Sequence, residues 1–191
     1  MDFPDWFTGL AGRYFDSWLL PRQWKGKPVR KALQIGVYTG DASLWIMNKL
    51  PTCVQLDDVD TWSGSDEDSH RALDFSTVED YYDERTREFR ELGRIRKFKM
   101  TSDEFFATCD QTYDLIYIDA DHHADQVLID ARNADKHLQR GGVMVFDDYG
   151  WRADSGLPED TPKPAVDQLL EDWKSTYKVL TVGYQVWLEK N

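Results

Sequence analysis

Carboxylates follow two hydrophobic segments of this 191-residue chain. The two segments, with the acids after them, read Tyr113-Asp-Leu-Ile-Tyr-Ile-Asp119-Ala-Asp121-His122-His123 and Gly141-Gly-Val-Met-Val-Phe-Asp147-Asp148-Tyr149. Ligands of parallel sheets bind at the carboxyl ends of the strands, so acids at two such ends predict an enzyme site. Asp119, Asp147 and Asp148 could supply three oxygen ligands to a cation, and such a set favours magnesium, calcium or manganese over zinc. The alternative is that these acids cap helices or lie in solvent.

The surrounding sequence alternates between strand and helix patterns, which predicts an α/β fold: a Rossmann-like, doubly wound, mostly parallel sheet. Strands are expected at 32–37, 53–59, 96–100, 113–119, 143–146, 178–182 and 184–188. Helices are expected at 41–50, 78–92, 101–109, in a segment that carries Val127 to Leu138 and ends at Gly141 and Gly142, and from Pro164 to Tyr177. The last two strands lie too close for a parallel crossover, so they must form a C-terminal antiparallel hairpin in a seven-stranded sheet.

Residues 1–191 are expected to form one domain, in which an N-terminal segment, 1–30, precedes a ligand-binding core, 31–191. Apolar residues recur at helical spacing from Phe3 to Trp18, and Pro21 is expected to end that helix. Such a helix could cover an edge of the sheet, act as a substrate lid or form a subunit contact. The sequence therefore leaves open whether the chain forms a homo-oligomer.

Composition narrows the class of protein. The net charge is −12, which disfavours nucleic acid and anionic membranes as partners because their phosphates would be repelled. Hydrophobic residues make up 41% of the chain, too many for a disordered protein. Neither a signal peptide nor a membrane span is recognisable, so a cytoplasmic location is expected. Cys53 and Cys109 stand alone, which predicts two reduced thiols.

The first strand ends in a glycine turn, Gln34-Ile-Gly36-Val-Tyr38-Thr-Gly40-Asp41-Ala-Ser43. This turn lacks the Gly-x-Gly-x-x-Gly pattern of dinucleotide sites, and Asp41 in the first helical turn would repel a pyrophosphate. A carboxylate after the second strand could accept hydrogen bonds from both hydroxyls of a ribose, and Asp57, Asp58 and Asp60 compete for that role. Together these features indicate a nucleoside cofactor without a phosphate chain, and S-adenosylmethionine fits both.

Six segments in this order carry a specific resemblance. They are Gln34 to Ser43, Val59-Asp-Thr-Trp-Ser-Gly64, Tyr113 to His122, Gly141 to Trp151, Pro164-Ala-Val-Asp-Gln-Leu-Leu170 and Tyr184-Gln-Val186. Together they resemble the class I S-adenosylmethionine-dependent methyltransferases, in particular methyltransferase family 24. The acidic segments are also similar to the metal site of the macrolide and aminocoumarin sugar O-methyltransferases, which hold magnesium.

The resemblance implies roles for individual residues. It implies that the cofactor-binding residues are Gly36, Tyr38, Gly40, Ser43, Asp60, Thr61, Trp62, Thr101, Ser102 and Asp119. The glycine turn would lie at the methionine end of the cofactor, Asp60 would bind its ribose, and Thr101 or Ser102 would lie near its adenine. Asp119, Asp147 and Asp148 would hold magnesium, and the catalytic base would be Asp121 or its rival His122. Family members commonly have Glu at position 34, so Asp41 is hypothesised to take over the charge that pairs with the cofactor's ammonium group.

These residues favour a cytosolic O-methyltransferase that acts on the hydroxyl of a small molecule such as a sugar or a phenol. A metal-dependent hydrolase with the same acids, or a non-catalytic binding domain, are the alternatives. Substrate choice is expected in the N-terminal helix, in the loop after Trp62 and in the segment from Arg152 to Pro162. Trp62, Tyr149 and Trp151 could stack on the acceptor or simply close the core.

Overall fold

The computed structural model describes residues 3–65, 73–152 and 158–191. Within these ranges, seven strands form one sheet in the order β3-β2-β1-β4-β5-β7-β6. The strands are β1 (Lys31–Ile35), β2 (Gln55–Asp60), β3 (Ile95–Lys99), β4 (Tyr113–Ile118), β5 (Leu138–Phe146), β6 (Tyr177–Val182) and β7 (Val186–Lys190). Strands β1 to β5 pair in parallel, while β7 runs antiparallel to both β5 and β6. The predicted mostly parallel sheet with a C-terminal hairpin is confirmed.

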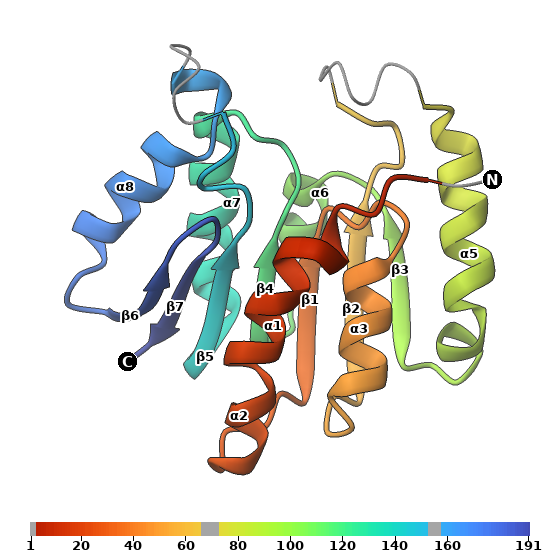
Figure 1. Ribbon diagram of the computed structural model, residues 1–191, viewed down its shortest axis with the longest axis horizontal. Helices are drawn as coiled ribbons and strands as arrows, with labels where there is room; N and C mark the ends of the chain where they lie inside the picture. The colour runs from red at the N-terminus through yellow and green to blue at the C-terminus, as the bar shows by residue number, and fades with distance from the viewer. Residues whose placement is uncertain (1–2, 66–72, 153–157) are drawn as a thin grey trace.

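Helices cover both faces of this sheet (Figure 1). They are the π-helix η1 (Phe7–Ala11), α1 (Gly12–Trp18), α2 (Leu20–Trp24), α3 (Asp41–Lys49), α5 (Phe75–Glu91), α6 (Ser102–Thr108), α7 (Ala124–His137), the 3-10 helix η2 (Pro158–Asp160) and α8 (Lys163–Asp172). One hydrophobic cluster joins α6, α7 and α8 to one face, and a second joins η1, α1 and α3 to the other. None of the helices in the described ranges is both long and apolar enough to cross a bilayer.

Strand register brings four separate loops to one level of the sheet. Ile35 of β1 pairs with Val59 of β2 and with Ile118 of β4, and Ile118 in turn pairs with Phe146 of β5. The residues that follow these four positions, Gly36, Asp60, Asp119 and Asp147, therefore leave the sheet side by side. Backbone hydrogen bonds of 2.8–3.0 Å from the amides of Gly36, Asp119 and Asp147 continue the ladders past the strand ends.

The N-terminal segment differs from its prediction in two ways. Pro21 does not end the helical region, because it occupies the first turn of α2, where its missing amide proton is not needed. Nor does the segment cover an edge of the sheet. The Phe15 ring packs edge-on against Tyr117 of β4 and Trp187 of β7, with centroids 5.0 and 5.3 Å away, so α1 lies on a face.

Several further predicted boundaries differ from the structure, and three of them have the same kind of cause. Leu138 was expected in a helix that ends at Gly141 and Gly142, but α7 ends at His137, because Leu138 pairs with Tyr113 and starts β5. Helix α8 ends at Asp172, and Tyr177 belongs to β6 rather than to the helix. Strand β7 begins at Val186, two residues later than predicted. In each case long-range strand pairing decides where an element ends, which the local apolar spacing does not report.

Candidate active site

The turn after β1 requires glycine for a structural reason. Gly36 has a φ of +81°, and a Cβ atom at this position would lie 1.8 Å from the carbonyl oxygen of Asp119. Only glycine allows the loops after β1 and β4 to approach this closely. Tyr38 in the same turn also has a positive φ, +52°, a conformation that costs free energy in a non-glycine residue and that clusters at functional sites. Gly40, at the N-terminus of α3, lies against Tyr82 of α5.

Asp60 holds this turn in place. Its Oδ2 atom accepts hydrogen bonds from the amides of Val37 and Tyr38 at 2.7 and 3.0 Å, and its Oδ1 atom accepts from the amide of Trp62 at 2.7 Å. The indole Nε1 of Trp62 donates to the Tyr38 carbonyl oxygen at 3.0 Å. Trp62 is buried and packs on Tyr82, so it closes the core beneath the turn.

Three polar side chains near the turn are already bonded to other groups of the protein. Ser43 Oγ donates to Gln34 Oε1 at 3.1 Å, and Gln34 Nε2 donates to the Gly36 carbonyl oxygen at 2.9 Å. Asp41 pairs with Arg85 of α5 at 2.6 Å and accepts from the Thr39 hydroxyl. The geometry argues against the hypothesis that Asp41 binds a cofactor ammonium group, because Arg85 already pairs with this carboxylate and Asp41 does not line the cavity described below.

The opposite side of the crevice concentrates acids, of which Asp147 is buried and Asp119 and Asp148 are half-buried. Tyr117 Oη is 3.0 Å from Asp119 Oδ2 and makes a short hydrogen bond to Asp147 Oδ2. Asp147 also accepts from Gln185 Nε2 at 3.0 Å and from the Asp148 amide at 2.8 Å. Burial, followed by the charges of Asp147 and Asp148, raises the pKa of Asp119 well above its usual value. Burial, and next the charge of Asp148, raises the pKa of Asp147 to about 6.

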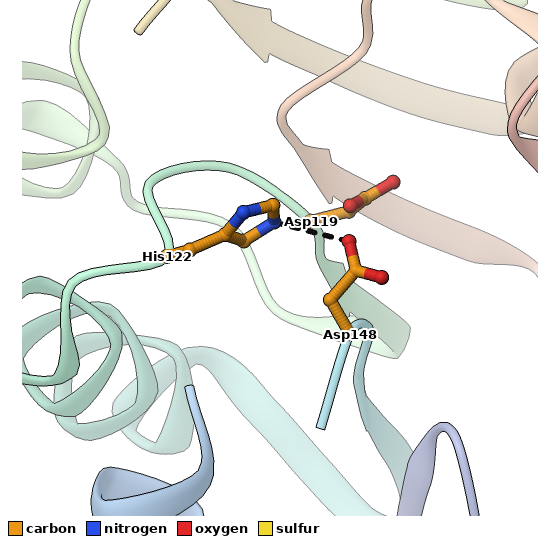
Figure 2. A group of neighbouring side chains, drawn as sticks. All are labelled: Asp119, His122 and Asp148. Carbon is orange, nitrogen blue, oxygen red and sulfur yellow. Dashed lines mark ion pairs between the residues drawn. The ribbon is translucent and has the colours of Figure 1, made fainter. Parts of the chain in front are cut away.

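Asp119, His122 and Asp148 form the group whose geometry suits a cation. One ligand atom from each of the three lies within 4.8 Å of the others. His122 Nε2 is 3.1 Å from Asp148 Oδ2, and Figure 2 shows the three side chains converging from the loops after β4 and β5. Asp148 has a φ of +53°, which turns its carboxylate away from the strand direction that Asp147 continues. Asp147, which was predicted as a ligand, lies outside this group of three and contacts it through Tyr117 and the Asp148 amide.

Asp121, the first candidate base, lies beside this group. Its Oδ1 atom is 2.6 Å from His123 Nδ1 and 2.9 Å from the His123 amide nitrogen. Its rival, His122, faces Asp148 and contacts the Trp151 ring, with a centroid distance of 4.7 Å. Trp151 therefore lies at the acid-rich side. Tyr149 turns away, and its hydroxyl donates to Asp167 of α8 at 2.7 Å.

A cavity of about 740 Å³ joins the glycine turn to the acids, a volume typical of small-molecule sites. Most of the predicted site residues line it: Gly36, Tyr38, Asp60, Thr61, Thr101, Ser102, Asp119, Asp121, His122, Asp147 and Asp148. Gly40, Ser43 and Trp62 do not line it. All lining residues named here belong to the described part of the chain. Residues 66–72 and 153–157, which belong to two segments expected to affect substrate choice, lie outside the described part.

Several cavity residues were not among the predicted site residues, although the N-terminal helix that carries Trp6 and Leu10 was expected to contribute to substrate choice. Trp6 and Leu10 of the N-terminal segment line it, as do Gln126 and Asp130 of α7 and Tyr184 before β7. Burial and a hydrogen bond to Asp148 raise the pKa of Tyr184. The spacing of four between Gln126 and Asp130 places them on one face of a helix, which was the available clue. Their position beside Ser102 depends on how α7 packs against α6.

This topology, with a ligand-sized crevice at the carboxyl ends of β1, β2, β4 and β5, defines a Rossmann-like nucleoside-binding class of enzyme. A family model described as a methyltransferase domain matches residues 33–149, more than half of the chain. The chain belongs to this methyltransferase family, and the predicted enzyme class is confirmed. A search of curated proteins found no match.

Solved structures share the fold at low sequence identity. A putative caffeoyl-CoA O-methyltransferase from Staphylococcus aureus aligns with a TM-score of 0.67 and 16% identity, over 100% of this chain and 86% of the other. The O-methyltransferase TomG from Streptomyces achromogenes, solved with S-adenosylmethionine, gives 0.66 and 18%, over 95% and 86%. An O-methyltransferase from Bacillus cereus, solved with S-adenosylhomocysteine, gives 0.64 and 15%, over 99% and 83%.

Proposed function

We propose that the protein is an S-adenosylmethionine-dependent O-methyltransferase that acts on a hydroxyl group of a small molecule with the help of a divalent cation. The observation that carries this proposal is the single cavity that contains both the glycine turn with Asp60 and the group Asp119, His122 and Asp148. Neither a hydrolase nor a simple binding domain needs both. Neighbouring folds solved with S-adenosylmethionine or S-adenosylhomocysteine support the choice of cofactor.

The glycine turn, together with Asp60, fits the methionine and ribose part of this cofactor. Asp60 already orients Val37 and Tyr38 through their amides at Oδ2, and Oδ1, which accepts only from the Trp62 amide, can accept a second hydrogen bond from a ribose hydroxyl. The absence of a side chain at Gly36 brings the β4 loop next to the turn. The sulfonium group, joined to the ribose, would then lie toward Asp119.

The acid-rich end fits a divalent cation. Asp119 and Asp148 offer carboxylate oxygens, and His122 offers an imidazole nitrogen. This mixed set of ligands suits manganese as well as magnesium, and magnesium is the first cation to test. Half-buried acids that lie close together are the arrangement that a cation stabilises. When bound, a divalent cation would lower the pKa of an acceptor hydroxyl and orient it.

The protein's own residues would handle the proton and the water. Both contacts of His123 with Asp121 fall on Oδ1, which leaves Asp121 Oδ2 to take the proton of the acceptor hydroxyl. Trp6, Leu10 and Trp151 supply apolar cavity wall that keeps water from the reacting atoms. Asp147 and Tyr117 hold Asp119 in position from beneath.

Two measurements on the same purified protein test the proposal. Calorimetry should show binding of S-adenosylhomocysteine both with and without EDTA. Transfer of a labelled methyl group to a panel of phenols, sugars and amines should label hydroxyl compounds, should require magnesium or manganese and should stop on chelation. Failure to bind S-adenosylhomocysteine would refute the cofactor. Transfer that persists in EDTA would refute the cation, and label found only on amines would refute the hydroxyl acceptor.

A further inference from the structure

One end of the cavity, between α6 and α7, contains a buried carboxyl group that the reaction does not use. Asp130 of α7 is 1% exposed, yet it lines the cavity together with Ser102 and Gln126. Its Oδ1 atom accepts a hydrogen bond from Gln126 Nε2 at 3.1 Å. Its Oδ2 atom is buried and has no partner at hydrogen-bond distance among the described residues, while the Ser102 hydroxyl lies close enough to the carboxyl group to interact with it. A buried acceptor without a donor costs free energy, so a ligand donor that reaches it would be favoured.

The chemistry of the proposed cofactor specifies which of its groups would reach this end. This inference rests on the proposed function. In S-adenosylmethionine the sulfur and the base are attached at opposite sides of the ribose. With the sulfur near Asp119 and the ribose at Asp60, the adenine base extends toward the loop after β3, where Met100, Thr101 and Ser102 line the cavity. Asp130 lies beside Ser102 at this far end, since Gln126 Nε2 is 3.4 Å from Ser102 Oγ.

We propose that Asp130 selects the adenine base by accepting a hydrogen bond from its 6-amino group at Oδ2. Gln126 orients the carboxyl by its bond to Oδ1, so that Oδ2 is the atom left for the ligand. A purine with a carbonyl group at position 6 presents an acceptor to the same oxygen, and two acceptors that face each other repel. Asp130 is therefore a specificity-determining residue for the base.

An isosteric substitution inverts the hydrogen-bonding character of this position. In Asp130→Asn the amide oxygen can keep the bond to Gln126, which places the Nδ2 donor where Oδ2 was. The variant should then disfavour the 6-amino base and accept the 6-carbonyl base. Asp103→Asn is the matched control, because Asp103 lines the same cavity end and loses the same charge, but lies on α6.

The experiment compares S-adenosylhomocysteine with its deaminated form, S-inosylhomocysteine, by calorimetry, and the thermal melting of each variant confirms folding. The natural protein and Asp103→Asn should prefer the adenosyl ligand by at least about tenfold, the size of one hydrogen bond. Asp130→Asn should lose or reverse that preference. An unchanged preference, or equal weakening of both ligands, would overturn the role of Asp130. If the natural protein binds neither ligand, the proposed function fails with it, and that result is distinguishable from the first two.

Discussion

The two ends of the cavity hold their acids in opposite ways. Asp60, at the glycine turn, accepts three backbone hydrogen bonds and has its charge spread over fixed amides. Asp119, two strands away in the sheet, has a tyrosine hydroxyl and two further carboxylates as its neighbours. Burial raises the pKa of Asp119, and the charges of Asp147 and Asp148 raise it further.

This difference separates positioning from chemistry. A carboxylate whose oxygens are met by amides is fixed in one orientation and suits the recognition of a cofactor that must always bind in the same way. Crowded acids in a buried site are electrostatically unfavourable as they stand, and such strain is typical of sites that take up a cation or handle a proton. Substitutions at the two ends should therefore affect different measurements.

The largest effect is expected at Asp148. Asp148→Asn keeps a residue that tolerates the positive φ and still accepts the Tyr184 hydrogen bond, but removes one charge from the group with Asp119 and His122. We expect kcat to fall by at least about 100-fold, because the acceptor hydroxyl loses its electrostatic activation. Steady-state kinetics at saturating magnesium measure the change.

Affinity for S-adenosylhomocysteine provides the control for this variant. It should stay within about threefold of the natural value, since Asp148 stands at the acid-rich end. Asp172→Asn, an exposed acid on α8, should change neither quantity. A large loss of cofactor affinity in Asp148→Asn would contradict the separation of the two ends.

The next effect is expected at Asp60. Asp60→Asn can keep one oxygen acceptor but replaces the other with an amide donor that faces backbone amides or the ribose. Charge-assisted hydrogen bonds are worth about 1.5–3 kcal/mol, so S-adenosylhomocysteine should bind about 10- to 100-fold more weakly. Calorimetry measures this, and turnover at saturating cofactor should fall by less than in Asp148→Asn. Unchanged affinity would show that Asp60 serves only the turn.

Asp58 tests whether a raised pKa is confined to the reacting end. It lies fully buried in β2, two residues before Asp60, and Tyr82 Oη donates to it at 2.9 Å. Burial raises its pKa to about 7. The folded state thus disfavours the ionised form, so stability is greatest below the unfolded pKa near 4 and is lost as the pH rises through 7.

The expected result is a pH-dependent free energy of unfolding. For the natural protein without cofactor it should fall between pH 5 and pH 8, with up to about 3 kcal/mol of the fall due to Asp58. Asp58→Asn should show a smaller fall, with the remainder due to Asp119, Asp130 and Asp147, whose pKa values burial also raises. Urea unfolding at both pH values measures this. An equal fall in both proteins would exclude Asp58 as the source.

Sequence patterns predicted this molecule best where local chemistry and register coincide. Strands that end in Gly36, Asp60, Asp119 and Asp147 were recognisable because apolar runs stop at glycine or acid, and parallel pairing then brings those ends together. The capping box at Thr101 was recognisable because both of its hydrogen bonds are local.

Contacts between distant segments were not predictable in this way. His122 lies in the group with Asp119 because the φ of Asp148 turns that carboxylate toward it, and no spacing rule reports a single backbone angle. Asp130 depends on the packing of α7 against α6. The ion pair of Asp41 was not predictable for the same reason, since its partner Arg85 is far away in the sequence, on α5.

The smallest effect is therefore expected at Asp41. This substitution tests whether the cofactor site extends into α3. Its ion pair with Arg85 is partly exposed, and such pairs contribute at most about 1 kcal/mol to stability. Asp41→Asn should bind S-adenosylhomocysteine within about twofold of the natural protein by calorimetry, and Arg85→Gln should behave alike because both remove the same pair. A tenfold loss confined to Asp41→Asn would restore this carboxylate to the cofactor site and extend that site into α3.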